Sequence, residues 1–443
     1  MRKDFGNSSQ SVLTSTLMLT FSSLLLQVLG FAYRIILSRM LSAEQMGVYG
    51  LMMPVYALLS AGTLSGFSVA AVRTTADFAG NAAALRKRAS AVLHMSLRLY
   101  ALLFCAVTVV FSLFSGNIAA LLGERGLQTA LLLLLPCLLM TAFENILKSV
   151  FQGIQNVVPS MVSECTEQLV RIVSVAILLY ITDSGAGKNG TACAVVVCGM
   201  MISEVASDLI LGAFAGDILH RKGGQKGLGK AILRCALPVC AGNACGMLLS
   251  SISGAVVPAA LRGYGLSASQ ALSEYGELSG MLLPLLGIPG AFVYPLNTVM
   301  LPRLTEALAA GNKAAFRRRV RKTLLSVALI ACCTEGAAVV LSPKLCALCF
   351  GTAYPAGSGA IVRLGIATLA GFVAAGAGCV LNAMKKQGTL VVTGIALGIA
   401  EIPLLMGAIR ESGLSGYADV SVVLGILQMA VLLYMVGRYV REP

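Results

Sequence analysis

The sequence predicts an all-α polytopic membrane protein with twelve transmembrane helices in two six-helix lobes. Of its 443 residues, 57% are hydrophobic and only 12% are charged, which is about half the charged fraction of an ordinary soluble domain. The apolar stretches are continuous and long enough for membrane-crossing helices, which need about 20 residues. Barrel strands would instead be about 10 residues long and would alternate in polarity. Basic residues, in addition, gather in every second loop.

Twelve apolar segments follow one another along the chain when it is scanned with a window of about 19 residues. The first six are 12–37, 47–71, 90–114, 128–151, 157–182 and 191–216. The second six are 231–256, 277–301, 323–343, 359–382, 389–409 and 417–437. The first segment is too long for the apolar core of a signal peptide and has no small-residue cleavage site. We therefore expect it to stay as the first span.

The loops between these segments differ in charge. Of the 33 Lys and Arg residues, 23 lie in one alternating set of loops and tails, and 8 lie in the other set. The basic runs 86–88 and 317–322 belong to the richer set. By the positive-inside rule, the richer set faces the cytoplasm, so both termini are expected there in a multi-pass protein of the cell membrane. The net charge of +14 then faces anionic lipid headgroups, and no nucleic-acid partner is expected.

Two cytoplasmic loops resemble each other. Residues 80–88 read GNAAALRKR and residues 311–319 read GNKAAFRRR, so they align without a gap. Chance similarity of an Ala-rich basic loop is the alternative explanation. Because six spans per repeat is an even number, the two lobes are expected to share one orientation and a pseudo-two-fold axis along the membrane normal. This predicts an N-terminal lobe at 1–219, a basic linker at 220–230 and a C-terminal lobe at 231–443, with a crevice between the lobes for alternating access.

Sequence features of catalysis and nucleotide binding are missing. There is no glycine-rich loop followed by Lys and Ser or Thr, as ATP binding would require. Cys346 and Cys349 form the only CxxC, and no second ligand pair accompanies them, so we expect neither a metal nor a cofactor. The only histidines, His94 and His220, lie near the cytoplasmic side. We therefore expect no enzyme activity, with a membrane glycosyltransferase or polymerase as a distant alternative.

Several motifs resemble those of a known family. They are LGFAYR at 29–34, SRML at 38–41, EQLVR at 167–171, and a proline-spaced string from Tyr275 to Ala307. Together they resemble the oligosaccharide flippases, most closely the stage V sporulation protein B group, within the superfamily of multidrug, oligosaccharidyl-lipid and polysaccharide exporters. The resemblance covers both lobes. Many flippases have two further C-terminal helices, and this chain ends after its twelfth predicted span, which argues against a lipid II cargo.

The resemblance implies that the chain flips a polyprenyl-linked saccharide across the bilayer for cell-wall, surface polysaccharide or spore cortex assembly. The protein is expected to act as a monomer. A cation-coupled multidrug extruder of the same superfamily is the alternative. Such extruders are expected to have an acidic residue in the first span, and segment 12–37 has none.

Charged residues inside the spans are the candidate site, because each costs about 2.5–3.5 kcal/mol near the bilayer centre. Glu167 and Arg171 lie four residues apart and therefore on one helix face. They either form a self-contained structural ion pair or open when a pyrophosphate competes for the Arg171 guanidinium, whose planar fork suits phosphate oxygens. Arg34 belongs to the family-like LGFAYR string and is a candidate for receiving the anionic headgroup, with an interfacial snorkelling role as the alternative.

Three further residues complete the predicted site. Arg98 either lines the inward half of the crevice or snorkels towards the cytoplasm. Glu204 and Asp208 lie four apart, and like charges on one face disfavour joint ionisation. They are therefore a candidate site for a coupling proton or sodium ion, with a pair between an acid and Arg98 or Arg171 as the alternative. Glu144, Glu335 and Glu401 are lone acids within spans, and we expect them to be hydrogen-bonded structural carboxyls.

Overall fold

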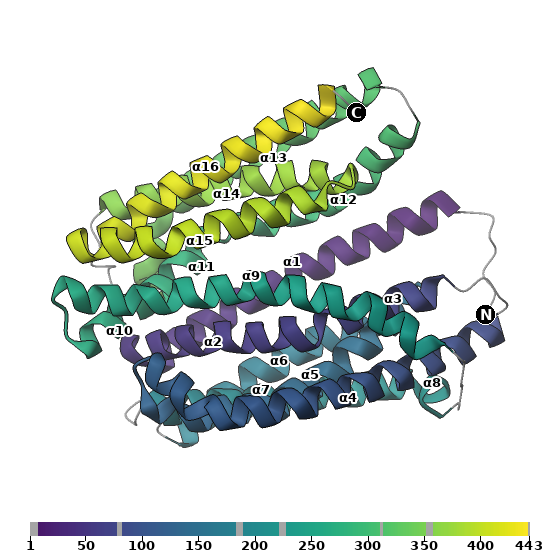
Figure 1. Cartoon of the computed structure of the whole chain (residues 1–443), viewed down its shortest axis with the longest axis horizontal. Coiled ribbons are helices and arrows are strands. Elements are labelled where there is room, and N and C mark those ends of the chain that lie inside the picture. Colours follow the sequence, from purple (N-terminus) through teal and green to yellow (C-terminus); the bar gives the residue numbers. More distant parts are fainter. Residues whose placement is uncertain are drawn as a thin grey trace. The chain divides into compact units, whose positions relative to one another are not determined.

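The computed structural model describes residues 8–77, 82–182, 189–220, 227–310, 313–350 and 358–441, and almost all of them are helical (Figure 1). No strand occurs in these ranges. The chain divides into two compact units, residues 1–251 and 252–443. The boundary lies within one long helix, α9 (Leu228–Tyr264).

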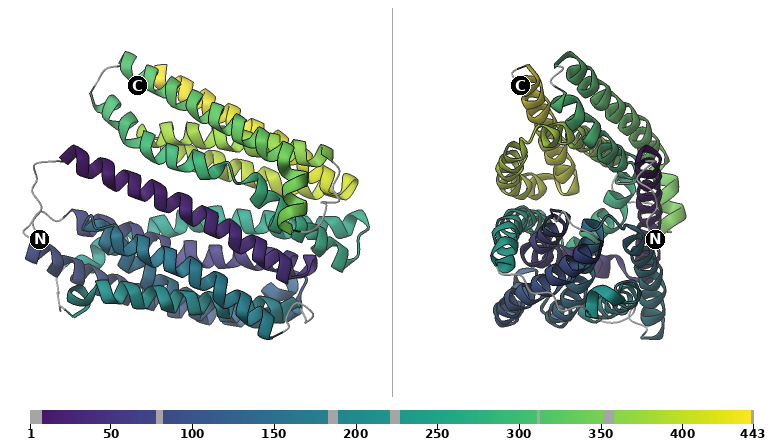
Figure 2. Two further views of the ribbon diagram at one scale, coloured as in Figure 1. Left: turned by 180° about the vertical axis from the view of Figure 1, so that it is seen from behind. Right: turned by 90° about the vertical axis from the view of Figure 1, so that its right-hand side faces the viewer.

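Within its described residues, the first unit contains eight helices, one short 3-10 turn (η1) and the start of α9. In chain order they are α1 (Ser8–Met40), α2 (Ala43–Thr63), α3 (Ser65–Ala76), α4 (Ala82–Leu121), η1 (Arg125–Leu127), α5 (Gln128–Gly153), α6 (Val158–Ile181), α7 (Asn189–Phe214) and α8 (Gly216–His220). The long helices α4, α5, α6 and α7 run alongside one another (Figures 1 and 2). This packing brings the polar faces of α5, α6 and α7 together.

The second unit contains the end of α9 and the remaining helices. These are α10 (Ala268–Glu277), η3 (Leu278–Leu282), α11 (Leu283–Leu286), α12 (Gly290–Ala309), α13 (Lys313–Phe350), α14 (Ser358–Ala383), α15 (Gln387–Ser412) and α16 (Leu414–Arg441). Its core lies where α12, α13, α14 and α16 meet, around Phe316, Ala377 and Leu381.

The predicted membrane spans are present as helices. Ten helices are long and apolar enough to cross a membrane, and a bent pair raises this number to eleven among the described residues. The remaining predicted span is α6, in which every 18-residue stretch contains the three charged residues Glu164, Glu167 and Arg171. At 24 residues, α6 is about 36 Å long, which exceeds the roughly 30 Å of the hydrocarbon core. The prediction of an all-α polytopic fold is therefore confirmed.

The predicted eighth span is broken rather than straight. It consists of Ala268–Leu286 and Gly290–Ala309, which meet at 52°. A π-helical turn, Leu278–Leu282, lies before the break, and Pro284 and Pro289 flank it. Proline has no N–H to donate and its ring clashes with the preceding turn, so such residues bend a helix.

The start of α9 packs with the first unit. The backbone N–H of Gly66 on α3 donates to the Cys240 Sγ at 3.2 Å, and the Ser251 hydroxyl donates to the carbonyl of Pro54 at 3.0 Å. The sequence assigned this helix to the lobe that begins at residue 231, whereas the compact unit extends to residue 251. The lobe boundaries and the rotation that relates the lobes stay predictions. Residues 221–226 of the linker lie outside the described residues.

The two resembling loops contain one equivalent contact. In the first unit, Arg88 Nε donates to the carbonyl of Thr74 at 3.2 Å. In the second unit, Arg319 Nη1 donates to the carbonyl of Arg303 at 2.8 Å. Arg88 and Arg319 occupy the same position of the aligned motifs. Each arginine joins the start of a long helix to the last turns of the preceding one, which agrees with an internal repeat.

Candidate functional site

Three neighbouring helices of the first unit bring an ion-pair cluster together. Glu144 and Lys148 come from α5, Glu167 and Arg171 from α6, and Glu204 from α7. Residues four apart lie one above the other on a helix, so the spacing within α5 and within α6 produces one acid–base pair each. The packing of α6 on α7 and of α5 on α7 then joins the two pairs through Glu204.

Arg171 binds two carboxylates and one hydroxyl. Its Nη2 donates to Glu167 Oε1 and, at 3.2 Å, to Glu204 Oε1. Its Nε donates to the Ser203 hydroxyl at 3.3 Å. The side chain is 16% exposed, so most of it is covered. The predicted Glu167–Arg171 pair exists, and the alternative of a pair between Glu204 and Arg171 is also realised.

Lys148 is the second cation of the cluster. Its Nζ lies 2.5 Å from Glu144 Oε1 and 3.6 Å from both Glu164 Oε1 and Glu167 Oε2. Only 6% of the residue is exposed. The sequence counts Lys148 among the 23 Lys and Arg residues of the basic loops and tails, whereas the structure places it inside α5. The three carboxylates that face the ammonium compensate its positive charge and so offset the free energy lost when it is removed from water.

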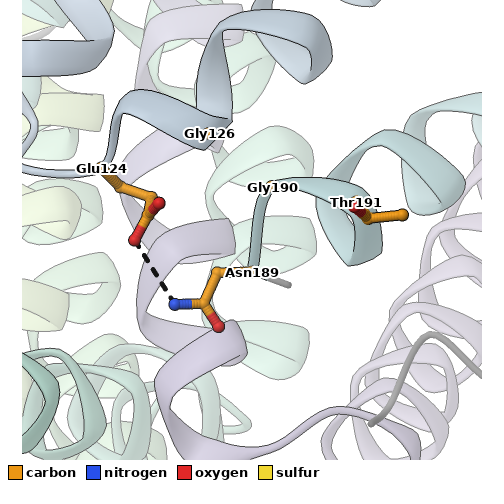
Figure 3. Close-up of a pocket in the computed structure, with 5 residues that line it drawn as sticks. All are labelled: Glu124, Gly126, Asn189, Gly190 and Thr191. Atoms are coloured by element: carbon orange, nitrogen blue, oxygen red, sulfur yellow. Dashed lines mark hydrogen bonds between the residues drawn. The ribbon is translucent and has the colours of Figure 1, made fainter. Parts of the chain in front are cut away.

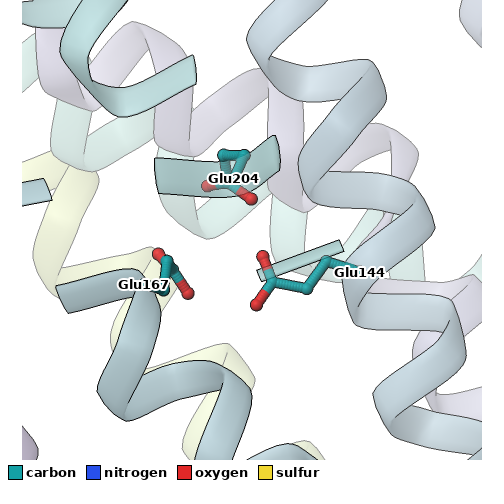
Figure 4. Close-up of side chains that lie close together, drawn as sticks. All are labelled: Glu144, Glu167 and Glu204. Atoms are coloured by element: carbon teal, nitrogen blue, oxygen red, sulfur yellow. The ribbon is translucent and has the colours of Figure 1, made fainter. Parts of the chain in front are cut away.

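Acids outnumber bases in the cluster. Glu144, Glu167 and Glu204 point towards one another (Figure 4), with one carboxylate oxygen of each within 4.8 Å of the others. The Ser207 hydroxyl donates to Glu144 Oε1 at 2.5 Å. Glu144 is therefore not a lone acid, contrary to the prediction from sequence. With Glu164 included, four carboxylates share two cations.

Two oxygens at the closed end of the cluster are not hydrogen-bonded. Glu204 Oε2 and Asp208 Oδ1 are buried and have no hydrogen-bond partner among the described residues. Buried polar atoms are almost always hydrogen-bonded. Oxygens of this kind can accept a proton or coordinate a cation, although Lys148 and Arg171 already form ion pairs with the glutamates of the cluster.

Exposure falls from one end of the cluster to the other. The Glu164 side chain is 35% exposed, those of Arg171 and Glu167 are 16% and 12%, and those of Glu204 and Glu144 are 3% and 1%. Glu164 is therefore at the more exposed end of the cluster, and Glu204 and Glu144 are at the more buried end.

Two residues of the predicted site lie outside this cluster. Arg34 on α1 and Arg98 on α4 are exposed on the protein, and neither forms an ion pair with a described residue. Asp208 lies one turn beyond Glu204 on α7 and makes no ion pair with the part of the chain that the structure describes. The structure thus brings Glu167, Arg171 and Glu204 together with Asp208 nearby, and it leaves the two other arginines apart.

The lone acids of the second unit have single neutral partners. Thr368 donates to Glu335 Oε1 at 2.7 Å, and Ser253 donates to Glu401 Oε2 at 3.2 Å. Glu335 is 2% exposed. Neither acid forms an ion pair among the described residues, which is what a hydrogen-bonded structural carboxyl requires.

A pocket at the start of α7 contains none of the predicted site residues (Figure 3). It has a volume of about 340 Å³ and is lined by Glu124, Gly126, Asn189, Gly190 and Thr191. Asn189 Nδ2 donates to Glu124 Oε2 at 3.4 Å and to Glu44 Oε1 at 2.8 Å. These bonds connect α7 with α2 and with the turn before α5.

Sequence reasoning missed Glu144, Glu164 and Lys148 as members of the site. One signal was present, because Glu144 and Lys148 have the same acid–x–x–x–base spacing as Glu167 and Arg171. The meeting of two such pairs depends on how α5, α6 and α7 are rotated about their axes. That rotation is determined by packing between helices and cannot be read from the spacing of residues within one helix.

Replacing Lys148 by methionine is expected to lower the free energy of unfolding by about 3–5 kcal/mol, because it leaves the buried Glu144 without a cation. The double variant Lys148→Met/Glu144→Gln should recover most of that loss. Both changes in stability can be measured by thermal unfolding in detergent, with the labelling of buried cysteine thiols as the signal for unfolding.

The control for this prediction is an exposed ion pair. Arg363 Nη1 lies 2.5 Å from Asp419 Oδ1, and the two side chains are 35% and 53% exposed. Arg363→Ala should change stability by about 0–1 kcal/mol. Equal losses in Lys148→Met and Arg363→Ala would contradict a buried ion-pair cluster.

Ten or eleven helices apolar enough to cross a membrane among the described residues, together with the charged α6, are the features of a multi-pass membrane protein. Solved structures share this fold. An inward-facing multidrug resistance transporter of the MATE family superposes with a TM-score of 0.74 at 15% identity, over 94% of this chain and 95% of that one. The lipid II flippase MurJ, in an inward closed conformation, superposes with a TM-score of 0.67 at 14% identity, over 95% and 87%.

The chain belongs to the polysaccharide biosynthesis protein family, whose model matches residues 12–308. It is also 26% identical over 331 residues to stage V sporulation protein B of Bacillus subtilis (strain 168). That match covers 72% of this chain and 62% of the relative, so the chain matches less than two thirds of the relative's length. The resemblance found in the sequence is confirmed, and the chain has the fold of these two solved structures.

Proposed function

We propose that this protein is a flippase that moves a lipid-linked oligosaccharide from the cytoplasmic to the outer leaflet of the cell membrane by alternating access. The observation that supports this most is the position of Arg171. A planar guanidinium binds phosphate oxygens with two parallel hydrogen bonds, and the Arg171 side chain keeps 16% of its surface exposed while that of Glu204 keeps 3%. A lipid diphosphate can take the place of the Glu167 and Glu204 carboxylates on the fork.

The rest of the proposal follows from the charge distribution and the family. Both termini lie in the cytoplasm, because the basic loops and tails alternate with poorly charged ones. The protein acts as a monomer and makes or breaks no covalent bond. Its product serves cell-wall, surface polysaccharide or spore cortex assembly, the last in keeping with the relatedness to the sporulation protein.

Arg34 and Arg98 are proposed to assist Arg171 in binding the anionic headgroup. Both are exposed on the first unit, where a charged side chain is available to a ligand. Glu204 and Asp208 are proposed to bind the coupling cation, since each has a buried oxygen without a hydrogen-bond partner among the described residues. Proton and sodium are the two cations considered.

The experiment is a leaflet-exchange assay on the purified protein in liposomes. A fluorescent polyprenyl-diphosphate oligosaccharide is placed in both leaflets, and a membrane-impermeant quencher reports the fraction that becomes accessible. The protein should speed this exchange well above that of empty liposomes. The assay is run with a proton gradient and with a sodium gradient, each in both directions. If the glycolipid exchanges no faster than in empty liposomes under all of these conditions, the proposal is rejected.

A second candidate function is cation-coupled export of a cationic drug. The observation that favours it is the acid excess, since four carboxylates share two cations in the cluster of the first unit. The same liposomes, loaded with ethidium, distinguish the two candidates. Ethidium movement without glycolipid exchange would favour the drug exporter, and the reverse result would favour the flippase.

A further inference from the structure

The first turns of α13 present a basic surface. Four of their side chains are exposed and positively charged, namely Arg317, Arg318, Arg321 and Lys322. Residues three and four apart are neighbours on a helix, so these side chains share one broad face, where like charges repel. Glu306 is the only acid between positions 300 and 322, and it pairs with Arg319 instead. None of the four forms an ion pair with the part of the chain that the structure describes.

The corresponding surface of the first unit is covered by protein. In the register of the two aligned loops, Arg321 corresponds to Ser90 of α4 and Lys322 to Ala91. Ser90 and Ala91 are 0% and 2% exposed. Ala91 belongs to a hydrophobic core that includes Ile218 of α8 and the start of α9, so these two helices cover the first turns of α4. In the second unit the same two positions are basic and exposed, and no described helix covers them.

An apolar stripe continues the basic surface along α13. Leu325 and Leu329 follow Arg318, Arg321 and Lys322 at helical spacing, and they are 66% and 62% exposed. The helix from Lys313 to Leu348 is long and apolar enough to cross a membrane, so the cations lie near one end of a span and the leucines lie further in. A soluble anion would use only the charges of such a surface, whereas a phospholipid uses both parts.

We infer that the second unit binds an anionic phospholipid of the bilayer at this surface, with the headgroup phosphate between Arg318, Arg321 and Lys322 and an acyl chain along Leu325 and Leu329. The inference goes beyond the proposed function, because it concerns a lipid of the surrounding membrane and not the cargo. Guanidinium groups bind phosphate oxygens through parallel hydrogen bonds. Clusters of Lys and Arg next to a membrane span are typical binding sites for anionic lipids.

Tryptophan fluorescence tests this inference, because the chain has no tryptophan of its own. In Leu329→Trp the single indole lies on the apolar stripe, where bromine on the acyl chain of a neighbouring lipid quenches it. The protein is reconstituted in phosphatidylcholine with a small fraction of either brominated phosphatidylglycerol or brominated phosphatidylcholine. One basic residue near an anionic headgroup contributes about fivefold in affinity. The quenching should therefore show that phosphatidylglycerol binds at least about fivefold more strongly than phosphatidylcholine.

The triple variant Arg318→Gln/Arg321→Gln/Lys322→Gln, in the same background, should abolish this preference. Arg317 stays unchanged, because its Nε donates to the carbonyl of Val440 at 3.3 Å and so joins α13 to α16. The three replaced side chains are exposed. Quenching by brominated phosphatidylcholine should therefore stay as it was, which shows that the variant is folded and inserted.

The matched control is Leu113→Trp on α4. Leu113 is 74% exposed and has no Lys or Arg within ten positions on either side, so the two brominated lipids should quench this reporter equally. Equal quenching in Leu329→Trp, a preference that survives the triple substitution, or the same preference in Leu113→Trp would overturn the inference. None of these results depends on glycolipid exchange, so the liposome assay tests the proposed function separately.

Discussion

Alanine in place of Arg171 is expected to reduce glycolipid exchange in liposomes by roughly 100-fold. Two charge-assisted hydrogen bonds to a phosphate contribute about 1.5 kcal/mol or more each, and a loss of about 3 kcal/mol corresponds to slightly more than 100-fold in an equilibrium constant. Arg171→Lys retains the charge and loses the planar fork, so it should keep part of the activity. The quencher-based exchange rate, divided by the amount of folded protein, measures both.

Arg171→Ala also leaves Glu204 unpaired, so the loss of activity must be separated from a loss of folding. The double variant Arg171→Ala/Glu204→Gln removes that buried charge and should fold normally while remaining inactive. Arg363→Ala, which breaks an exposed ion pair with Asp419, should exchange at the wild-type rate. Arg34→Ala tests the second proposed arginine and should also be inactive. If Arg171→Ala and Arg34→Ala both exchange normally, the assignment of the site is wrong.

Gly66→Ala is expected to lower the free energy of unfolding by about 3 kcal/mol, at the upper end of the usual cost of overpacking. A Cβ at this position would lie 2.0 Å from the carbonyl oxygen of Ala236 and 2.8 Å from the Cys240 Sγ. The first of these is backbone of α9 and cannot turn away as a side chain could. The helices α3 and α9 would have to separate, which would also break the bond from the Gly66 N–H to Cys240.

The matched control is Gly212→Ala on α7, where an added Cβ meets no atom within 4 Å. Alanine is a better helix former than glycine by about 0.5–1 kcal/mol, so this variant should be as stable as the wild type or slightly more stable. The chain has no tryptophan but has 13 cysteines, so labelling of buried thiols such as Cys137 and Cys193 reports unfolding. Equal stability of the two variants would contradict the close crossing of α3 and α9.

Much of the fold could be predicted from the sequence, because hydrocarbon permits only fully hydrogen-bonded segments. The apolar stretch 128–151 coincides with α5 (Gln128–Gly153) and 359–382 with α14 (Ser358–Ala383). The stretch 47–71 proved to be two helices, α2 and α3, which meet at Leu64. A hydropathy scan does not detect the break at Leu64, because the residues on both sides of it are equally apolar.

The site could be predicted only within single helices. The spacing of Glu167 and Arg171 identified a pair on α6, and the spacing of Glu204 and Asp208 identified a second polar face on α7. What joins them to Glu144 and Lys148 is contact between helices far apart in sequence. A fixed number of residues per turn determines which side chains share a face, whereas the direction of that face depends on packing against the neighbours. For this reason Glu144 was interpreted as a lone acid.

The broken span of the second unit has a consequence for motion. In hydrocarbon, a backbone bends cheaply only where hydrogen bonds of the helical ladder are already missing, and the 52° junction between Leu286 and Gly290 is such a place. The two rods on either side can change their mutual tilt by small rotations at Gly287, Ile288 and Pro289 without unwinding. The junction is therefore the place where Ala268–Leu286 and Gly290–Ala309 can tilt against each other.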